Sequence, residues 1–178
     1  MKSFTNILLI GGAGRNAGKT SFACYLISHF SSRVQLIGLK VSSHLHPVQN
    51  QNEILTMTDD YIIYREFSRN SGKDSSRMLK AGASAVYFIE SDDNHLAEAF
   101  RKLLPVIGSQ PVICESASLA KFITPGILIF IENRLLPTES KNANLRRKAD
   151  FIVHYFENSF DFKTSHLQFV ENEWKYLK

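Results

Sequence analysis

Hydrophobic residues gather along this chain in short, nearly unbroken runs instead of alternating with polar ones. The runs are NILLI (6–10), VQLIGLKV (34–41), AVYFI (85–89), PVIC (111–114), ILIFI (127–131) and DFIVHYF (150–156). Strands that are apolar on both faces are typical of a parallel sheet that helices cover on each side. The pattern therefore predicts a set of fully buried strands.

Between these runs, hydrophobic positions recur with the spacing of an amphipathic helix. One stripe holds Phe22, Ala23, Leu26, Ile27 and Phe30, and another holds Leu96, Phe100, Leu103 and Leu104. Strands and helices in turn predict βαβ units with right-handed crossovers. We expect an α/β fold of three layers, with a mostly parallel sheet, helices on both faces and the strand at 6–10 in the centre.

Two stretches follow this pattern less clearly. Residues 42–72 show little periodicity, and DDYIIYREF (59–67) within them fits a strand or a helix. The tail SHLQFVENEWKYLK (165–178) has the alternation of a hairpin that turns near Glu171-Asn172. A C-terminal hairpin is therefore expected outside the βαβ pattern.

Composition narrows the class of protein without naming a function. A chain of 178 residues with 44% hydrophobic and 21% charged residues fits one globular domain over 1–178. The net charge of +4 suits an anionic ligand but is too small to indicate nucleic acid. Two isolated cysteines, no signal peptide and no membrane-length apolar run lead us to expect a reduced, cytoplasmic protein without a membrane partner.

The strongest chemical signal is the segment LLIGGAGRNAGKTSFACYLISHF, in which glycines separate a strand from a helix. Its end, Gly18-Lys19-Thr20, closes a P-loop motif, although Ala13 replaces one glycine of the pattern. The fold expected is thus a three-layer P-loop NTPase fold. The candidate nucleotide ligands are Gly12, Ala13, Gly14, Arg15, Asn16, Ala17, Gly18, Lys19, Thr20 and Ser21.

Each part of such a loop has a physical task. Small residues let backbone N–H groups converge on phosphate oxygens, and the positive end of the following helix dipole points at the same oxygens. Lys19 adds a cation for the β- and γ-phosphates, and the Thr20 hydroxyl can coordinate Mg²⁺. The alternative is a glycine-rich turn between strand and helix that holds no ligand.

An acidic residue is expected to face this loop from a neighbouring strand. PVICES (111–116) is an apolar run that ends in Glu115, as in a Walker B strand. Glu115 would then bind Mg²⁺, directly or through water, or orient the attacking water. Thr20 and Glu115 are thus the candidate metal ligands, and Lys19 and Glu115 the candidate catalytic residues. The alternative is a solvated acid at the end of a strand.

A further stretch resembles a known family. SGKDSSRMLKAGASAVYFIE (71–90) is similar to the Gly-Lys-Asp-Ser, helix, Ala-Gly-Ala, strand segment of the molybdopterin-guanine dinucleotide biosynthesis protein B family. The resemblance covers residues 5–135 and includes IGLK (37–40). It implies a GTP-binding P-loop protein that forms homodimers and acts as an adaptor in attaching a nucleotide to molybdopterin, with molybdopterin or a cofactor-biosynthesis enzyme as partner. It also implies that Gly14, Gly18, Lys19 and Thr20 are nucleotide ligands, Lys40 a site residue and Glu115 the Walker B acid.

The residues of this segment can be interpreted on their own chemistry. Asp74 or Ser75 is expected to cap a helix that continues through Leu79. Lys73 at the start of that helix would add positive charge for an anion, or is simply an exposed lysine. The guanine-reading motif Asn-Lys-x-Asp is not intact, but Asn133 at a strand end could reach a base. The nucleotide expected is GTP or ATP with Mg²⁺.

The leading hypothesis is a nucleotide-binding adaptor or weak GTPase related to molybdenum-cofactor biosynthesis. A P-loop kinase for a small molecule is an alternative that needs an acceptor pocket within 42–72. A metal-insertion GTPase is another, with His44 and His46 joined by Cys24 or Cys114, although we expect the two histidines not to form a high-affinity site. A nucleotide-binding interaction module without turnover is the last.

Overall fold

The computed structural model describes residues 2–14, 16–43, 53–135 and 142–177. The strands are β1 (Lys2–Gly12), β2 (Ile37–Ser42), β3 (Glu53–Met57), β4 (Tyr61–Arg65), β5 (Ala85–Ser91), β6 (Val112–Glu115), β7 (Ile123–Asn133), β8 (Phe151–Phe156), β9 (Ser159–Phe160), β10 (Leu167–Val170) and β11 (Glu173–Tyr176). The helices are α1 (Lys19–Phe30), α2 (Asp74–Lys80), α3 (Leu96–Ile107) and α4 (Ala143–Lys148), with 3-10 turns η1 (Leu119–Lys121) and η3 (Thr164–His166).

The described residues form one large sheet with the strand order β3-β4-β5-β2-β6-β1-β7-β8-β9. The strands from β5 to β8 in this order are parallel, and they coincide with the apolar runs of the sequence. The additions at both edges, β3-β4 and β9, are antiparallel. The predicted mostly parallel sheet is confirmed, and β1 lies inside it between β6 and β7.

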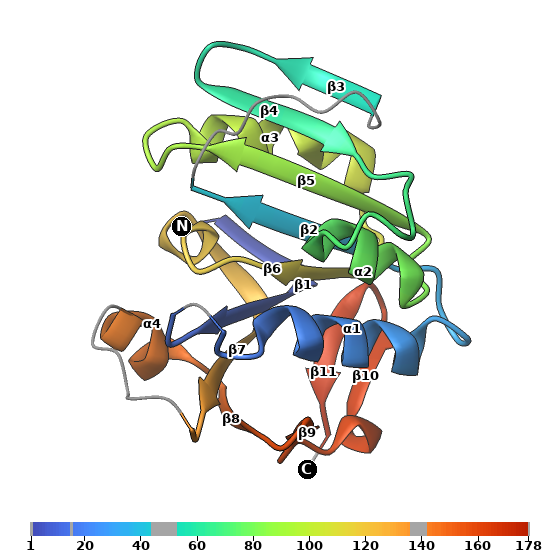
Figure 1. The fold of residues 1–178 in the computed structure, drawn as a ribbon, viewed down its shortest axis with the longest axis vertical. Coiled ribbons are helices and arrows are strands. Elements are labelled where there is room, and N and C mark those ends of the chain that lie inside the picture. The colour runs from blue at the N-terminus through green and yellow to red at the C-terminus, as the bar shows by residue number, and fades with distance from the viewer. Residues whose placement is uncertain (1, 15, 44–52, 136–141, 178) are drawn as a thin grey trace.

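Helices cover both faces of the sheet (Figure 1), because successive residues of each buried strand point to opposite sides. In β1, Leu8 and Ile10 pack in the cluster that contains α1 and α2. Ile7 and Leu9 pack in the cluster that contains α3. Figure 1 shows α1 and α2 in front of the sheet and α3 behind it, which confirms the three-layer arrangement.

The segment that fitted a strand or a helix is a strand. Residues 61–65 form β4 and pair antiparallel with β5. Ile62 and Ile63 are β-branched and Tyr61 and Tyr64 are aromatic, and such side chains favour a pleated, half-buried surface. The uncertain region therefore extends the sheet at its edge.

The C-terminal hairpin of β10 and β11 is also confirmed. Glu171 and Asn172 form its turn with φ of +56° and +63°, the left-handed conformation of a two-residue hairpin turn. Trp174 anchors the hairpin: its side chain is buried, and its ring centroid lies 5.2 Å from that of Phe30 at the end of α1. The indole Nε1 donates a hydrogen bond to the carbonyl of Val112, at 3.2 Å.

Candidate phosphate-binding site

The loop between β1 and α1 has the backbone that the sequence predicts. Gly14 and Gly18 adopt φ of +133° and +95°, where a side chain would be strained, and Asn16 adopts +58°. Gly18 also lacks space for a side chain, because an added Cβ would lie 2.9 Å from Cγ of Tyr155. Glycine is therefore required at position 18 by conformation and by packing. Arg15 lies outside the described residues.

A cavity of about 550 Å³ opens in front of this loop, at the carboxyl ends of the central strands. It is lined by Asn16, Ala17, Gly18, Lys19, Thr20, Ser21, Lys40, Asp74, Arg77, Glu115 and Tyr155. Most of the predicted ligands thus meet in one place. In parallel α/β sheets, ligands bind in the crevice outside the carboxyl ends of the strands, which is where this cavity lies.

Other predicted residues support the loop without lining the cavity. The carbonyl of Gly12 accepts a hydrogen bond from Nδ2 of Asn142, and the N–H of Ala13 donates to the carbonyl of Ile131. Nδ2 of Asn133 donates to the carbonyl of Asn16 at 3.2 Å. Asn133 therefore holds the loop in this structure, whereas its predicted contact with a base remains a prediction.

Lys19 begins α1 and reaches back over the loop. Its ammonium group donates a hydrogen bond to the carbonyl of Gly14. The side chain thus reaches back from the start of α1 over the loop. This is the place that a cation must occupy to contact phosphates held by the loop.

Thr20 and Glu115 are brought into direct contact. Oγ1 of Thr20 donates a hydrogen bond to Oε2 of Glu115 at 2.7 Å, and both side chains are buried. The sheet register explains the contact, since Glu115 ends β6 opposite Ile10 of β1 and Lys40 of β2. A hydroxyl and a carboxylate at one end of a cavity supply the hard oxygen donors that Mg²⁺ prefers. The donor set therefore fits the predicted metal.

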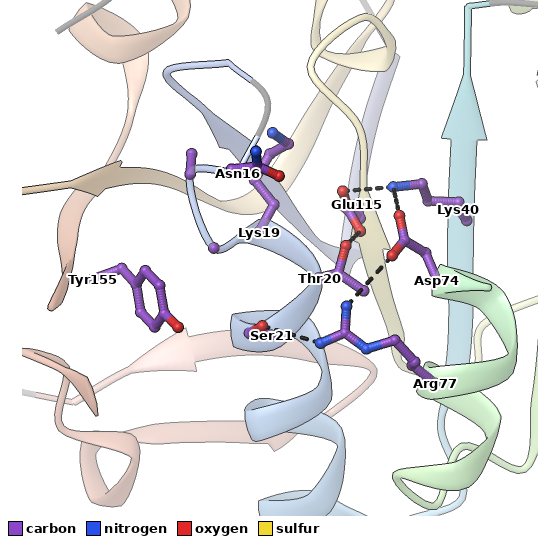
Figure 2. A pocket seen from close by; sticks show the side chains of 11 residues that line it. Asn16, Lys19, Thr20, Ser21, Lys40, Asp74, Arg77, Glu115 and Tyr155 are labelled. Carbon is purple, nitrogen blue, oxygen red and sulfur yellow. Dashed lines mark hydrogen bonds and ion pairs between the residues drawn. The ribbon is translucent and has the colours of Figure 1, made fainter. Parts of the chain in front are cut away.

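Lys40 lies between two carboxylates (Figure 2). Its Nζ is 2.6 Å from Oε1 of Glu115 and 2.8 Å from Oδ2 of Asp74. Burial alone would lower the pKa of Lys40, but the charge of Glu115 and the hydrogen bonds to both carboxylates outweigh it and raise the pKa above its ordinary value. Burial likewise favours protonated Asp74, yet the hydrogen bond and charge of Lys40 hold the pKa of that carboxyl below its usual value.

The predicted capping of α2 by Asp74 or Ser75 is wrong. The helix is preceded by Lys73 in an extended conformation, with no side-chain capping hydrogen bond. Asp74 and Ser75 lie inside the first turn, past the N-cap position from which a side chain caps a helix, and the Asp74 carboxylate accepts a hydrogen bond from Lys40 at 2.8 Å instead. The Ser75 hydroxyl donates to buried Glu66 at 2.8 Å. Lys73 is not among the residues that line the cavity.

Besides Asp74, two more residues of the cavity were not anticipated. Arg77 donates from Nη2 to Oγ of Ser21 at 3.1 Å and lies 3.5 Å from Asp74, so it joins α2 to the first turn of α1. Tyr155 comes from β8 and lies against Gly18 on the other side of the loop (Figure 2). Arg77 lies three residues after Asp74, so both share one helix face, but the sequence does not show that this face meets the cavity. Tyr155 reaches the cavity because its strand, β8, pairs with β7 in the sheet.

The cysteines do not form a metal centre with other described residues. The described part of the chain holds no group of three or more His, Cys, Asp or Glu residues placed to bind a metal ion. Burial, with small effects of neighbouring charges, raises the pKa of Cys24 to about 11. Burial also raises the pKa of Cys114. His44 and His46 lie outside the described residues, so the expectation about them stays a prediction.

A strand, a glycine-rich loop and a helix on a parallel sheet, with an acid at the end of the adjacent strand, define a P-loop NTPase fold. A solved structure of LpxK from Aquifex aeolicus in complex with ATP is similar to this chain, with a TM-score of 0.57 and 17% sequence identity. The alignment covers 92% of this chain and 52% of that one, so this chain spans about half the length of LpxK. At this identity the likeness shows the fold.

No family model and no curated protein matches the chain. The resemblance to the molybdopterin-guanine dinucleotide biosynthesis protein B family is therefore not confirmed, and the structural comparison supports the P-loop NTPase fold alone. Among the described residues, no helix is long and apolar enough to cross a membrane.

Proposed function

We propose that this chain binds a nucleoside triphosphate together with Mg²⁺ at the cavity in front of the P-loop. One observation carries the proposal: the loop with Lys19, and the Thr20–Glu115 pair 2.7 Å apart, line the same cavity. The loop and Lys19 supply the contacts that phosphates need, and Thr20 and Glu115 supply the oxygen ligands that Mg²⁺ needs. The alternative, a glycine-rich turn without a ligand, does not explain why a buried acid lies beside the hydroxyl at the end of the loop.

The roles of the residues follow from their contacts. The N–H groups from Asn16 to Ser21 would hold phosphate oxygens, and the Lys19 ammonium would leave the Gly14 carbonyl for the β- and γ-phosphates. Thr20 donates a hydrogen bond to Glu115, which leaves the lone pairs of Oγ1 for a metal. Bound Mg²⁺ would neutralise charge on the phosphates.

Turnover by the isolated protein is proposed to be slow. A general base needs a carboxylate or imidazole that can take a proton from the attacking group. Glu115 accepts hydrogen bonds from both Thr20 and Lys40, and Asp74 accepts one from Lys40. Both acids of the cavity thus already accept hydrogen bonds from other side chains, which favours a binding protein or a weak triphosphatase.

The finer role, a GTP-binding homodimer that serves molybdenum-cofactor biosynthesis, is supported by the resemblance over residues 71–90. That stretch contains α2, which supplies Asp74 and Arg77 to the cavity. The segment that carries the resemblance thus lies beside the proposed nucleotide. Comparing GTP with ATP, and measuring the mass of the particle in solution, tests the base and the homodimer.

Isothermal titration calorimetry of the purified chain with GTP and with ATP, each with Mg²⁺ or EDTA, tests the proposal. We expect at least one triphosphate to bind, more tightly with Mg²⁺ than with EDTA. Thr20→Val removes the hydroxyl at similar volume and should abolish most of the Mg²⁺ effect. Lys102→Ala, at an exposed position of α3, is the matched control and should bind as the parent does. Absence of binding by both triphosphates in the parent would refute the proposal.

A further inference from the structure

Lys40 occupies an unusual position for a residue beside a metal site. Its Nζ lies 2.6 Å from the carboxylate that is proposed to bind Mg²⁺, and the other oxygen of that carboxylate accepts a hydrogen bond from Thr20. The Lys40 side chain is 16% exposed and Glu115 is 4% exposed, so water screens the contact poorly. The charge of Glu115 is therefore already balanced by a cation.

A metal ion at Thr20 and Glu115 would stand close to that ammonium group. Magnesium–oxygen distances are about 2.1 Å, so an ion on the Glu115 carboxylate would lie on the order of 5 Å from Nζ. Like charges at this separation in a partly buried cavity repel strongly. Lys40 and Mg²⁺ thus compete for one carboxylate.

A bound triphosphate would end the competition between Lys40 and Mg²⁺ for the Glu115 carboxylate. Lys40 donates hydrogen bonds to Asp74 and Glu115, and an ammonium group has three donors on a flexible four-carbon stem. Its side chain lines the same cavity as Lys19, Thr20 and the loop. A phosphate chain held there would offer Lys40 new acceptors while it supplies oxygen ligands to the metal.

We propose that Lys40 couples metal binding to triphosphate binding: it neutralises Glu115 in the empty site, and moves to a phosphate oxygen when the triphosphate and Mg²⁺ arrive. The inference rests on the proposed function. Asp74 keeps the ammonium within the cavity during the exchange, because its contact with Lys40 does not involve the metal ligands. Lys40 is a positioning residue that makes Mg²⁺ alone a poor ligand.

The coupling predicts effects of opposite sign in one variant. In Lys40→Met, Mg²⁺ without nucleotide should bind at least about tenfold more tightly than to the parent, because Glu115 has lost its competing cation. The same variant should bind the triphosphate with Mg²⁺ at least about tenfold more weakly, because a charge-assisted contact is gone. A residue that only supports the fold would not strengthen any binding.

Titration calorimetry and melting curves with MgCl₂ alone, and with Mg²⁺ plus the triphosphate, measure both effects. Lys40→Arg retains the cation and should resemble the parent with Mg²⁺ alone. Asp74→Asn leaves Lys40 on Glu115 and should not gain metal affinity. Lys40→Gln, which retains a donor for Asp74, replaces the Met variant if circular dichroism shows that the latter does not fold.

The outcomes separate the inference from the proposed function. If the parent binds triphosphate while the Lys40 variants bind Mg²⁺ alone no better than the parent, the coupling is wrong and the proposed function stands. Gained metal affinity with unchanged triphosphate affinity refutes the transfer of Lys40 to phosphate. If the parent binds neither triphosphate, the proposed function fails, whatever the metal titrations show.

Discussion

Replacing Lys19 by alanine tests the phosphate loop most directly. The Lys19 ammonium contacts the Gly14 carbonyl within the loop and faces the cavity. Removing the side chain leaves a carbonyl that cavity water can solvate, so the free protein should lose no more than about 1 kcal/mol of stability. With nucleotide, however, charge-assisted hydrogen bonds worth about 1.5–3 kcal/mol are lost.

These energies convert into measurable changes. A loss of 1.5–3 kcal/mol weakens affinity by roughly ten- to hundredfold. Nucleotide at a hundred times the parent's dissociation constant adds about 2.7 kcal/mol of stability, whereas the variant at the same concentration gains only about 0.4–1.4 kcal/mol. For a domain of this size, the melting shift is then roughly 5–10 °C in the parent and about 1–5 °C in the variant.

Differential scanning fluorimetry with GTP or ATP and excess Mg²⁺ measures these shifts, and calorimetry gives the affinities. Lys19→Arg retains a cation and should fall between the parent and Lys19→Ala. Lys102→Ala controls for the loss of one positive charge far from the cavity. Equal nucleotide-induced shifts in the parent and in Lys19→Ala would refute the reasoning that the loop holds the phosphates.

Three further outcomes are expected. Gly18→Ala should lose more stability than Gly72→Ala in urea denaturation, and should lose nucleotide binding as well. Both glycines have positive φ, but of the two only Gly18 has another group within 4 Å of an added Cβ. Cys24, with a pKa of about 11, should be labelled slowly by a thiol reagent at pH 8, where about one thiol in a thousand is ionised. The labelling rate should rise about tenfold for each pH unit above pH 8, and rapid labelling at pH 7 would contradict this. Trp174→Ala should cost about 3–5 kcal/mol of unfolding free energy without changing nucleotide affinity, and a loss of affinity would show that the hairpin supports the loop.

The parallel part of the sheet could be predicted from the sequence because strands that are buried on both faces have continuous apolar runs. The sequence was insufficient for β3, since this edge strand is partly solvated and its hydrophobic pattern is weaker. β3 shows this clearly, because Ile54, Leu55 and Met57 are exposed apolar residues on a strand with no regular alternation. The sequence was also insufficient for β4, because an apolar run as short as YIIY fits a strand or a helix.

Some residues of the candidate site could likewise be predicted from the sequence, and others could not. Lys19, Thr20 and Glu115 could be predicted because a local motif and a strand end fix their positions. Arg77 and Tyr155 reach the cavity only through the packing of α2 and β8, which no local pattern encodes. The role of Asp74 was misjudged because its partner, Lys40, lies 34 residues away in the sequence. Local capping rules cannot anticipate a charge that the sheet brings into contact.

The hairpin has an optical consequence. The chain contains one tryptophan, and its buried ring contacts Phe30 at the last turn of α1, while the phosphate loop lies at the first turn. The 12 residues of α1 separate these ends by about 18 Å. Tryptophan emission should therefore follow the melting of the hairpin and be nearly silent to ligand in the loop. A change in emission on adding nucleotide would report that α1 shifts along its length as a rigid rod.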